Sequence, residues 1–243
     1  MEKEQDNLSK SLGKTLVESD LSNVTSDILE SVLDEGLLSE GILKDIPIIS
    51  SLIGIGKTIN SVQDYLFTKK IVSFLIGLSS IDKKERNEVI SKINSDSKYK
   101  QSVGSKLLFI LDNAQDHITS NLISKLFVAF IKGELTYKEF CKASLIINKV
   151  DYYDLEVFLN LDNSNYGRNG TEGSGLEEVD NFLINAGLCS AESGPVTIED
   201  QDDWKAEEKY IVKGGETIIY RTLIGSKIHK ILSKKKNTSD NNA

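Results

Sequence analysis

Apolar residues recur at helical spacing through the middle of the chain, and this pattern constrains the fold more than any other feature. Between residues 103 and 131 they fall three or four positions apart, at Val103, Leu107, Ile110, Leu111, Ala114, Ile118, Leu122, Ile123, Leu126, Phe127, Phe130 and Ile131. In an α-helix this spacing places the side chains on one face, which has to be buried against another element. The region therefore predicts amphipathic helices that pack against one another as a bundle.

Polar residues indicate where individual helices of this bundle begin. Thr136 and Glu139 have the spacing of a capping box, which predicts a helix running through Val150. Asp27 and Glu30 have the same spacing ahead of another apolar stripe. Further helices are expected at 58–78, 83–93 and 151–161. We therefore predict a helical bundle over residues 26–161, preceded by a polar N-terminal arm at residues 1–25.

The composition changes after residue 161. Residues 162–175 contain four glycines and three asparagines with almost nothing apolar, which predicts a flexible linker. Residues 176–233 then form a smaller unit, with two β-rich runs around Gly214-Gly215 that predict a hairpin with a two-residue turn. Residues 234–243 are a polar, disordered tail. The expected fold class is mainly α: a multi-helix bundle followed by a small α+β unit with one β-hairpin.

Two motifs in the C-terminal unit match the end of a known domain. NAGL, at residues 185–188, resembles the recognition helix that closes with Gly-Leu. IIYRTLIGSKIHKIL, at residues 218–232, resembles a wing strand that runs into a Thr-x-x-Gly helix. On these motifs residues 176–232 resemble the second half of a winged-helix domain. The resemblance implies a helix, a hairpin and a final helix, and it makes a DNA-binding regulator one alternative for the function.

The charge of this unit argues against DNA as its ligand. Between Asn169 and Trp204 there are nine acidic residues and not one lysine or arginine. Contacts from Lys and Arg to phosphate supply much of the affinity for DNA, so this stretch is predicted to repel it. We expect a protein partner instead, because acidic loops and tryptophan suit protein interfaces better than phosphate. The candidate contact residues are Glu177, Glu178, Asp180, Asp202, Asp203 and Trp204.

No set of residues indicates catalysis, a metal site or a bound cofactor. The two cysteines, Cys141 and Cys189, and the two histidines, His117 and His229, lack metal-ligand spacing and the signature of a Cys–His nucleophile. We therefore expect no catalytic residue, no metal, no cofactor and no enzymatic activity. Two cysteines also make no disulfide framework, and MEKEQDNLSK lacks the apolar core of a signal peptide, which together predict a cytoplasmic protein.

A degenerate P-loop NTPase is a further alternative, suggested by GIGKT at residues 54–58. A phosphate-binding loop has Gly, four residues and then Gly-Lys-Ser/Thr, whereas Ser51 stands at the first glycine here and Leu52 and Ile53 follow it. LLFILD at residues 107–112 mimics the apolar strand that ends in a magnesium-binding aspartate. Its apolar residues have a helical period, however, so the motif is predicted to be coincidental.

Two apolar segments, 46–56 and 71–81, leave a membrane-active protein as another alternative. Each has 11 residues, whereas a helix needs about 20 to cross a bilayer, so both are predicted to be buried core helices. Residues 44–78 also resemble segments of uncharacterised bacterial helical proteins. A formal net charge of −8 and heavy use of Asn, Lys, Ile and Ser are typical of an acidic protein from an AT-rich genome. The favoured hypothesis is a bacterial or phage accessory or regulatory protein, with phage defence as one context, that acts by protein–protein binding.

Overall fold

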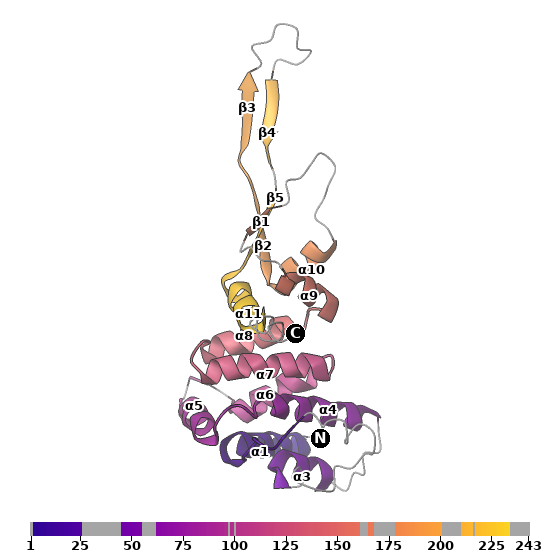
Figure 1. Cartoon of the computed structure of the whole chain (residues 1–243), viewed down its shortest axis with the longest axis vertical. Helices are drawn as coiled ribbons and strands as arrows, with labels where there is room; N and C mark the ends of the chain where they lie inside the picture. Colours follow the sequence, from indigo (N-terminus) through magenta and orange to yellow (C-terminus); the bar gives the residue numbers. More distant parts are fainter. Residues whose placement is uncertain are drawn as a thin grey trace, which may run out of the picture. The chain divides into compact units, whose positions relative to one another are not determined.

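The computed structural model divides into two compact units, Met1–Asn148 and Lys149–Ala243 (Figure 1). It describes residues 2–25, 45–54, 62–96, 98–99, 101–160, 165–167, 178–200, 210–215 and 217–233. The chain is mainly α-helical, and the strands of the described part all belong to the second unit. The expected helix at 27–36, residues 55–58 of the GIGKT motif and the tail at 234–243 lie outside the described residues.

The first unit is a helical bundle, as the apolar pattern predicted. Its described helices are α1 (Glu2–Glu18), α3 (Pro47–Gly54), α4 (Val62–Gly77), α5 (Lys83–Ser95), α6 (Val103–Asp112), α7 (His117–Ile131) and α8 (Tyr137–Ile147). The predicted capping box is present at the start of α8, where the Thr136 side chain accepts from the Glu139 backbone N–H and the Glu139 carboxylate accepts from the Thr136 backbone N–H. LLFILD lies within α6, so it is helix and not strand.

Aromatic side chains form the centre of this bundle. Phe127 on α7 lies edge-on to Phe74 of α4 at 5.7 Å between ring centroids, and to Phe140 of α8 at 5.2 Å. Helix α4 packs along α7, and α7 packs against α8. Edge-to-face contacts of this kind add to the free energy gained from burial alone. The stripe that the sequence shows on α7 is therefore the surface that joins three helices.

The N-terminal residues are not the polar arm that the sequence predicted. Glu2–Glu18 form α1, which packs against α3, α5 and α6. Leu12 and Leu16 are fully buried in these contacts. Arg86 of α5 is also fully buried, and its Nη2 donates to the Ser19 carbonyl oxygen at 2.5 Å. A short apolar stripe on α1 is thus sufficient for burial because three other helices surround it.

The two short apolar segments are core, as predicted, as far as the structure describes them. Ile48 and Ile49 of α3 are fully buried, and so are Ile71 and Leu75 of α4. None of the described helices is both long enough and apolar enough to span a bilayer.

The second unit begins earlier than expected. Its boundary lies after Asn148, not within the glycine-rich stretch 162–175. Helix α9 (Tyr152–Asn160), which the sequence placed in the bundle, packs against α10 (Glu178–Ala186) and α11 (Leu223–Ser233) instead. Part of the expected linker is also structured, because Asn165–Gly167 form strand β1 and pair with β5.

The strands of this unit form one long antiparallel hairpin to which β1 is added. Strands β2 (Cys189–Ser193) and β3 (Val196–Asp200) run out, and β4 (Tyr210–Gly214) and β5 (Thr217–Arg221) return. β2 pairs with β5 from Cys189↔Arg221 to Ser193↔Thr217, and β3 pairs with β4 from Val196↔Gly214 to Asp200↔Tyr210. The register is therefore continuous across the break between the two pairs.

The glycine pair at 214–215 does not form the turn that the sequence predicted. Gly214 and Gly215 do have positive φ, at 92° and 78°, but they lie midway along the returning side of the hairpin. There the Gly215 backbone N–H donates to the Pro195 carbonyl oxygen at 3.3 Å. Positive φ suits a bend within a strand as well as a tight turn. The chain instead reverses between Asp200 and Tyr210, so the hairpin is much longer than expected.

Candidate functional site

The outer part of the hairpin, Val196–Asp200 paired with Tyr210–Gly214, has two chemically different faces; we call it the β3–β4 ribbon. Residues directly opposite each other in an antiparallel pair point to the same side of the sheet. Ile198 lies opposite Val212, and Asp200 lies opposite Tyr210. Val196, Ile198, Tyr210 and Val212 therefore share one side, which we call the apolar face.

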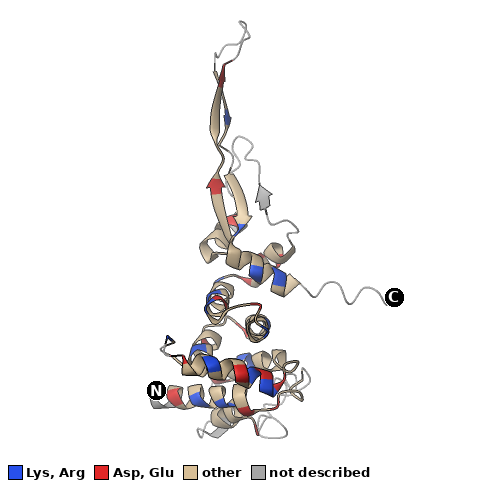
Figure 2. Ribbon diagram, turned by 90° about the vertical axis from the view of Figure 1, so that its left-hand side faces the viewer, with Lys and Arg blue, Asp and Glu red and all other residues tan. Residues whose placement is uncertain are grey.

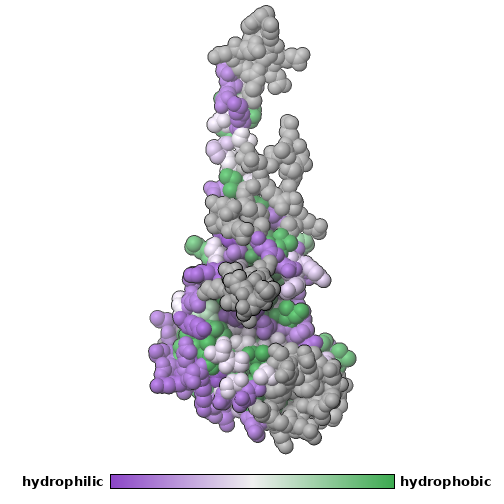
Figure 3. Space-filling model, viewed as in Figure 1, coloured by the Kyte–Doolittle hydropathy of each residue, from purple (hydrophilic) through white to green (hydrophobic). Residues whose placement is uncertain are grey.

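The apolar face is exposed to solvent. The exposed fractions are 61% for Val196, 69% for Ile198, 54% for Tyr210 and 66% for Val212. An antiparallel sheet with one apolar side normally buries that side on a core. Here none of the described residues covers it. Contiguous exposed apolar surface of this kind marks interaction sites in soluble proteins. The side of the ribbon turned to the viewer in Figure 3 is mainly hydrophilic, with small hydrophobic spots.

The opposite face of the ribbon carries Thr197, Glu199 and Lys213, together with Ile211, which lies opposite Glu199. Lys213 Nζ lies 2.6 Å from the Glu199 carboxylate, and the Thr197 hydroxyl donates to the Lys213 carbonyl oxygen at 3.4 Å. Both charged side chains are more than half exposed, and Figure 2 shows the few charged positions on the ribbon. Three of its four positions are polar, so this face is better suited to water than the apolar face.

Among the candidate contact residues predicted from the sequence, Asp180 is the one whose side chain the structure describes. Asp180 is fully buried in α10, so it is wrong as a direct contact residue. Its position one turn before the buried Leu183 places it on the inner side of the helix. Glu178 begins α10, but its side chain lies outside the described part, and so does Glu177.

The other three candidates belong to the nine-residue segment that joins the two strands of the ribbon. Asp202, Asp203 and Trp204 lie outside the described residues, but their place in the chain attaches them to the end of the ribbon. The apolar face itself was missed from the sequence. Its signal was the alternation of Val196 and Ile198 with polar residues before the acidic segment. After that segment Tyr210, Ile211 and Val212 are consecutive apolar residues and show no such alternation.

No family model, curated protein or solved structure matches this chain.

Groups able to do chemistry do not gather elsewhere in the described part of the chain. Burial raises the pKa of the Cys141 thiol, which makes it a poor nucleophile. Burial, followed by the nearby charge of Lys69, lowers the pKa of His117. Cys189 is buried on β2. Among the described residues, no three His, Cys, Asp or Glu side chains are placed to hold a metal ion.

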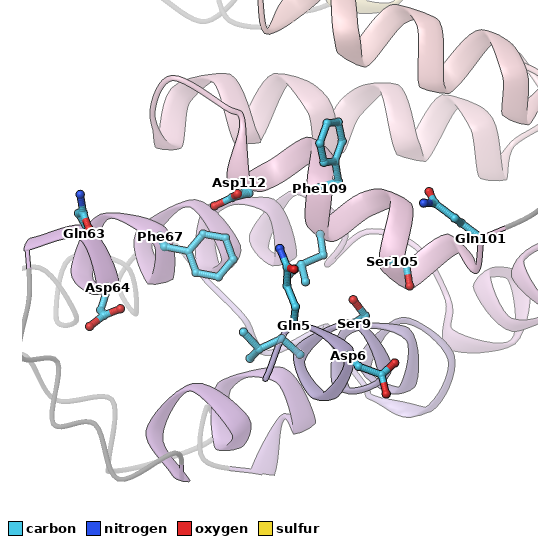
Figure 4. Close-up of a pocket in the computed structure, with 12 residues that line it drawn as sticks. Gln5, Asp6, Ser9, Gln63, Asp64, Phe67, Gln101, Ser105, Phe109 and Asp112 are labelled. Atoms are coloured by element: carbon cyan, nitrogen blue, oxygen red, sulfur yellow. The ribbon is translucent and has the colours of Figure 1, made fainter. Parts of the chain in front are cut away.

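A cavity in the first unit is the other place with functional potential. Helices α1, α4 and α6 line a space of about 570 Å³ (Figure 4), which is a common size for a ligand site. Its walls carry three carboxylates and two aromatic rings, those of Asp6, Asp64, Asp112, Phe67 and Phe109. Lysines lie beside these carboxylates: Lys10 Nζ pairs with the Asp6 carboxylate at 2.6 Å, and Lys70 Nζ donates to the backbone carbonyl oxygen of Asp112 at 3.1 Å. The mixed charge favours no single class of ligand, so the ribbon is the stronger candidate.

Proposed function

We propose that this chain is a non-enzymatic cytoplasmic protein that acts by binding another protein through the apolar face of the β3–β4 ribbon. The observation that carries the proposal is the exposure of the four large apolar side chains on one face, each of which is more than half accessible to solvent. Burying such side chains is favourable by roughly 25 cal/mol for every Å² of apolar surface removed from water. A two-stranded ribbon is marginal by itself, so a partner that covers this face would stabilise both molecules.

The segment between Asp200 and Tyr210 contains Trp204, an aromatic of the type that dominates binding energy at interfaces. A composition typical of an AT-rich bacterial or phage genome fits an accessory or regulatory role, and phage defence is one such setting.

A DNA-binding regulator is the second candidate, and the order of elements favours it. Helix α10 is followed by the hairpin and then by α11, and β1 pairs with β5, an order of elements that resembles the second half of a winged-helix domain. Lys227 and Lys230 give α11 a basic side. The residues of α10 include no lysine or arginine, however, and a helix that reads DNA needs such groups beside the phosphates.

The test compares two double variants of the full chain in capture experiments from native lysate. Ile198→Thr with Val212→Thr keeps two β-branched side chains but makes the apolar face polar. Glu199→Gln with Lys213→Gln is the matched control, because it changes two side chains of the opposite face. A partner that is retained by the control and lost with the threonine variant supports the proposal.

Two outcomes would count against it. A partner that the threonine variant retains, or that both variants lose equally, shows that the apolar face is not the interface. Binding of duplex DNA that weakens steeply with salt and is abolished by changes in α10 shows that the regulator is the correct function.

A further inference from the structure

The shape and charge of the apolar face restrict what kind of protein element covers it. This inference rests on the proposed function, and it concerns which element of the partner meets the ribbon. Three properties of the described residues bear on the choice: the side of the ribbon that is apolar, the size of that side, and the position of the carboxylates.

The apolar residues favour packing on the face of the ribbon over addition of a strand at its edge. A two-stranded sheet has a free backbone edge on each side, and a third strand would bind there through main-chain hydrogen bonds. Such a strand would leave Val196, Ile198 and Val212 in water, because their side chains point away from the plane of the sheet. An element that lies across the face would bury them.

The dimensions of the face match a short α-helix. Each strand of the ribbon has five residues, which span about 17 Å at the usual rise of a strand. An α-helix of about 11 residues has the same length, and its diameter of about 10–12 Å matches two strands placed about 5 Å apart with their side chains. A helix of three turns with apolar residues at i, i+3 or i+4, and i+7 would cover all four side chains.

The carboxylates at the end of the face specify the charge of that helix. Asp200 lies opposite Tyr210 and shares the apolar side, so the face ends in an exposed acidic group. The connecting segment 201–209 adds four acidic residues and only two lysines. A partner helix with Lys or Arg beside Asp200 would meet this charge favourably, whereas an acidic helix would be repelled.

The same features disfavour a second copy of the chain as the occupant. Two copies each carry a formal net charge of −8, and like charge opposes their association. The ribbon also has only ten paired residues in each copy, whereas a stable specific interface uses about 20–30 residues on each side. A small contact of this size suits a short segment of a partner.

We propose that the apolar face of the β3–β4 ribbon binds a basic amphipathic α-helix of about three turns from a partner protein. The helix lies across Ile198 and Val212, and its basic residues lie at the Asp200 end of the ribbon.

The test uses the full chain and three synthetic helical peptides of twelve residues, with binding measured by fluorescence anisotropy at low and moderate salt. The first peptide has a leucine stripe and lysines on the other positions. The second has the same composition in scrambled order, so it keeps the charge and loses the stripe. The third has glutamate in place of lysine. We expect the first peptide to bind at least tenfold more tightly than the other two.

Variants of the chain then locate the binding site. Ile198→Thr with Val212→Thr is expected to weaken binding of the first peptide at least tenfold, and Asp200→Asn about threefold at low salt. The control Glu199→Gln with Lys213→Gln is expected to stay within twofold. Equal binding of the scrambled peptide, or binding that the threonine variant leaves unchanged, overturns the inference.

The failure of this inference is distinguishable from failure of the proposed function. If capture of a partner requires the apolar face but no basic helical peptide binds to it, the protein-binding function stands and the proposal of a helix is wrong. Mass measurements that show a dimer of the chain, lost in the threonine variant, would replace the helix with a second copy. If neither the partner nor the peptide depends on the face, both proposals fail.

Discussion

Gly104 on α6 lies directly against Gly13 on α1. A methyl group added at Gly104 would lie 2.8 Å from the Gly13 backbone nitrogen and 2.5 Å from the Ser9 carbonyl oxygen. A methyl group added at Gly13 would instead lie 3.9 Å from the Gly104 Cα, an ordinary van der Waals contact. The contact is therefore asymmetric, because only the missing side chain of Gly104 points into the other helix.

This asymmetry predicts opposite effects for two alanine substitutions. Gly104→Ala should destabilise the first unit by about 1–3 kcal/mol, because backbone atoms of α1 have to move away. Gly13→Ala should be neutral or stabilising by up to about 1 kcal/mol, since alanine favours a helix interior more than glycine. Urea denaturation of both variants measures the difference, and equal destabilisation by the two would show that the helices do not meet as described.

Helices α4 and α7 approach each other in the same way at Gly77 and Ser124. A methyl group at Gly77 would lie 2.5 Å from the Ser124 Cβ, so Gly77→Ala should cost about 1–3 kcal/mol of stability. Ser124→Gly removes the atoms in conflict. In a double-mutant cycle the combined variant should therefore be more stable than the sum of the two single changes predicts. Additive losses would contradict the contact.

Two adjacent residues of α6 differ in their exposure to solvent. Ile110 is fully buried, whereas the neighbouring Phe109 is 54% exposed. Ile110→Asp should destabilise the first unit by several kcal/mol, because it buries an unpaired charge. Phe109→Asp introduces the same charge on the same helix and should cost much less. Thermal melting followed by circular dichroism tests this, and small losses for both variants would place Ile110 at the surface.

The helical bundle was predictable from the sequence because its signals are local. The spacing of Ile110, Phe127 and Phe130 and the capping box at Thr136 depend only on residues a few positions apart. Helix α1 was missed because its stripe, Leu12 and Leu16, is too short to predict burial without knowledge of the helices around it. The structure assigns its core role through contacts with α3, α5 and α6.

The hairpin and the candidate site were harder to predict because they depend on strand pairing. Gly214-Gly215 has the composition of a tight turn, and the sequence alone gives no reason to prefer a bend within a strand. A turn placed at Gly214-Gly215 does not pair Ile198 with Val212. The register from Val196 to Asp200 brings them together, and it replaces the acidic helix face with an apolar face as the candidate surface.

The last prediction concerns stability at alkaline pH. Burial raises the pKa of the Cys141 thiol, and burial together with the neighbouring Cys141 raises the pKa of the Tyr137 hydroxyl. Both groups are therefore easier to deprotonate in the unfolded chain than in the folded one. Their contribution is fully present below the unfolded pKa of the thiol, about 8.5, and it is lost as the pH rises through the folded values. The urea midpoint should fall between pH 8 and pH 10.

Substitution of Cys141 isolates its part of this dependence. Cys141→Ala removes the thiol, so its urea midpoint should fall less steeply between pH 8 and pH 10 than that of the parent chain. Cys189→Ala is the matched control, because the other cysteine lies on β2 in the second unit. The rate of alkylation at Cys141 should also rise at a higher pH than for a free thiol, since only the thiolate reacts. Two results together would contradict this prediction: Cys141→Ala keeps the pH dependence of the parent chain, and Cys141 of the parent chain is alkylated as readily as a free thiol. They would show that the Cys141 side chain is accessible to solvent.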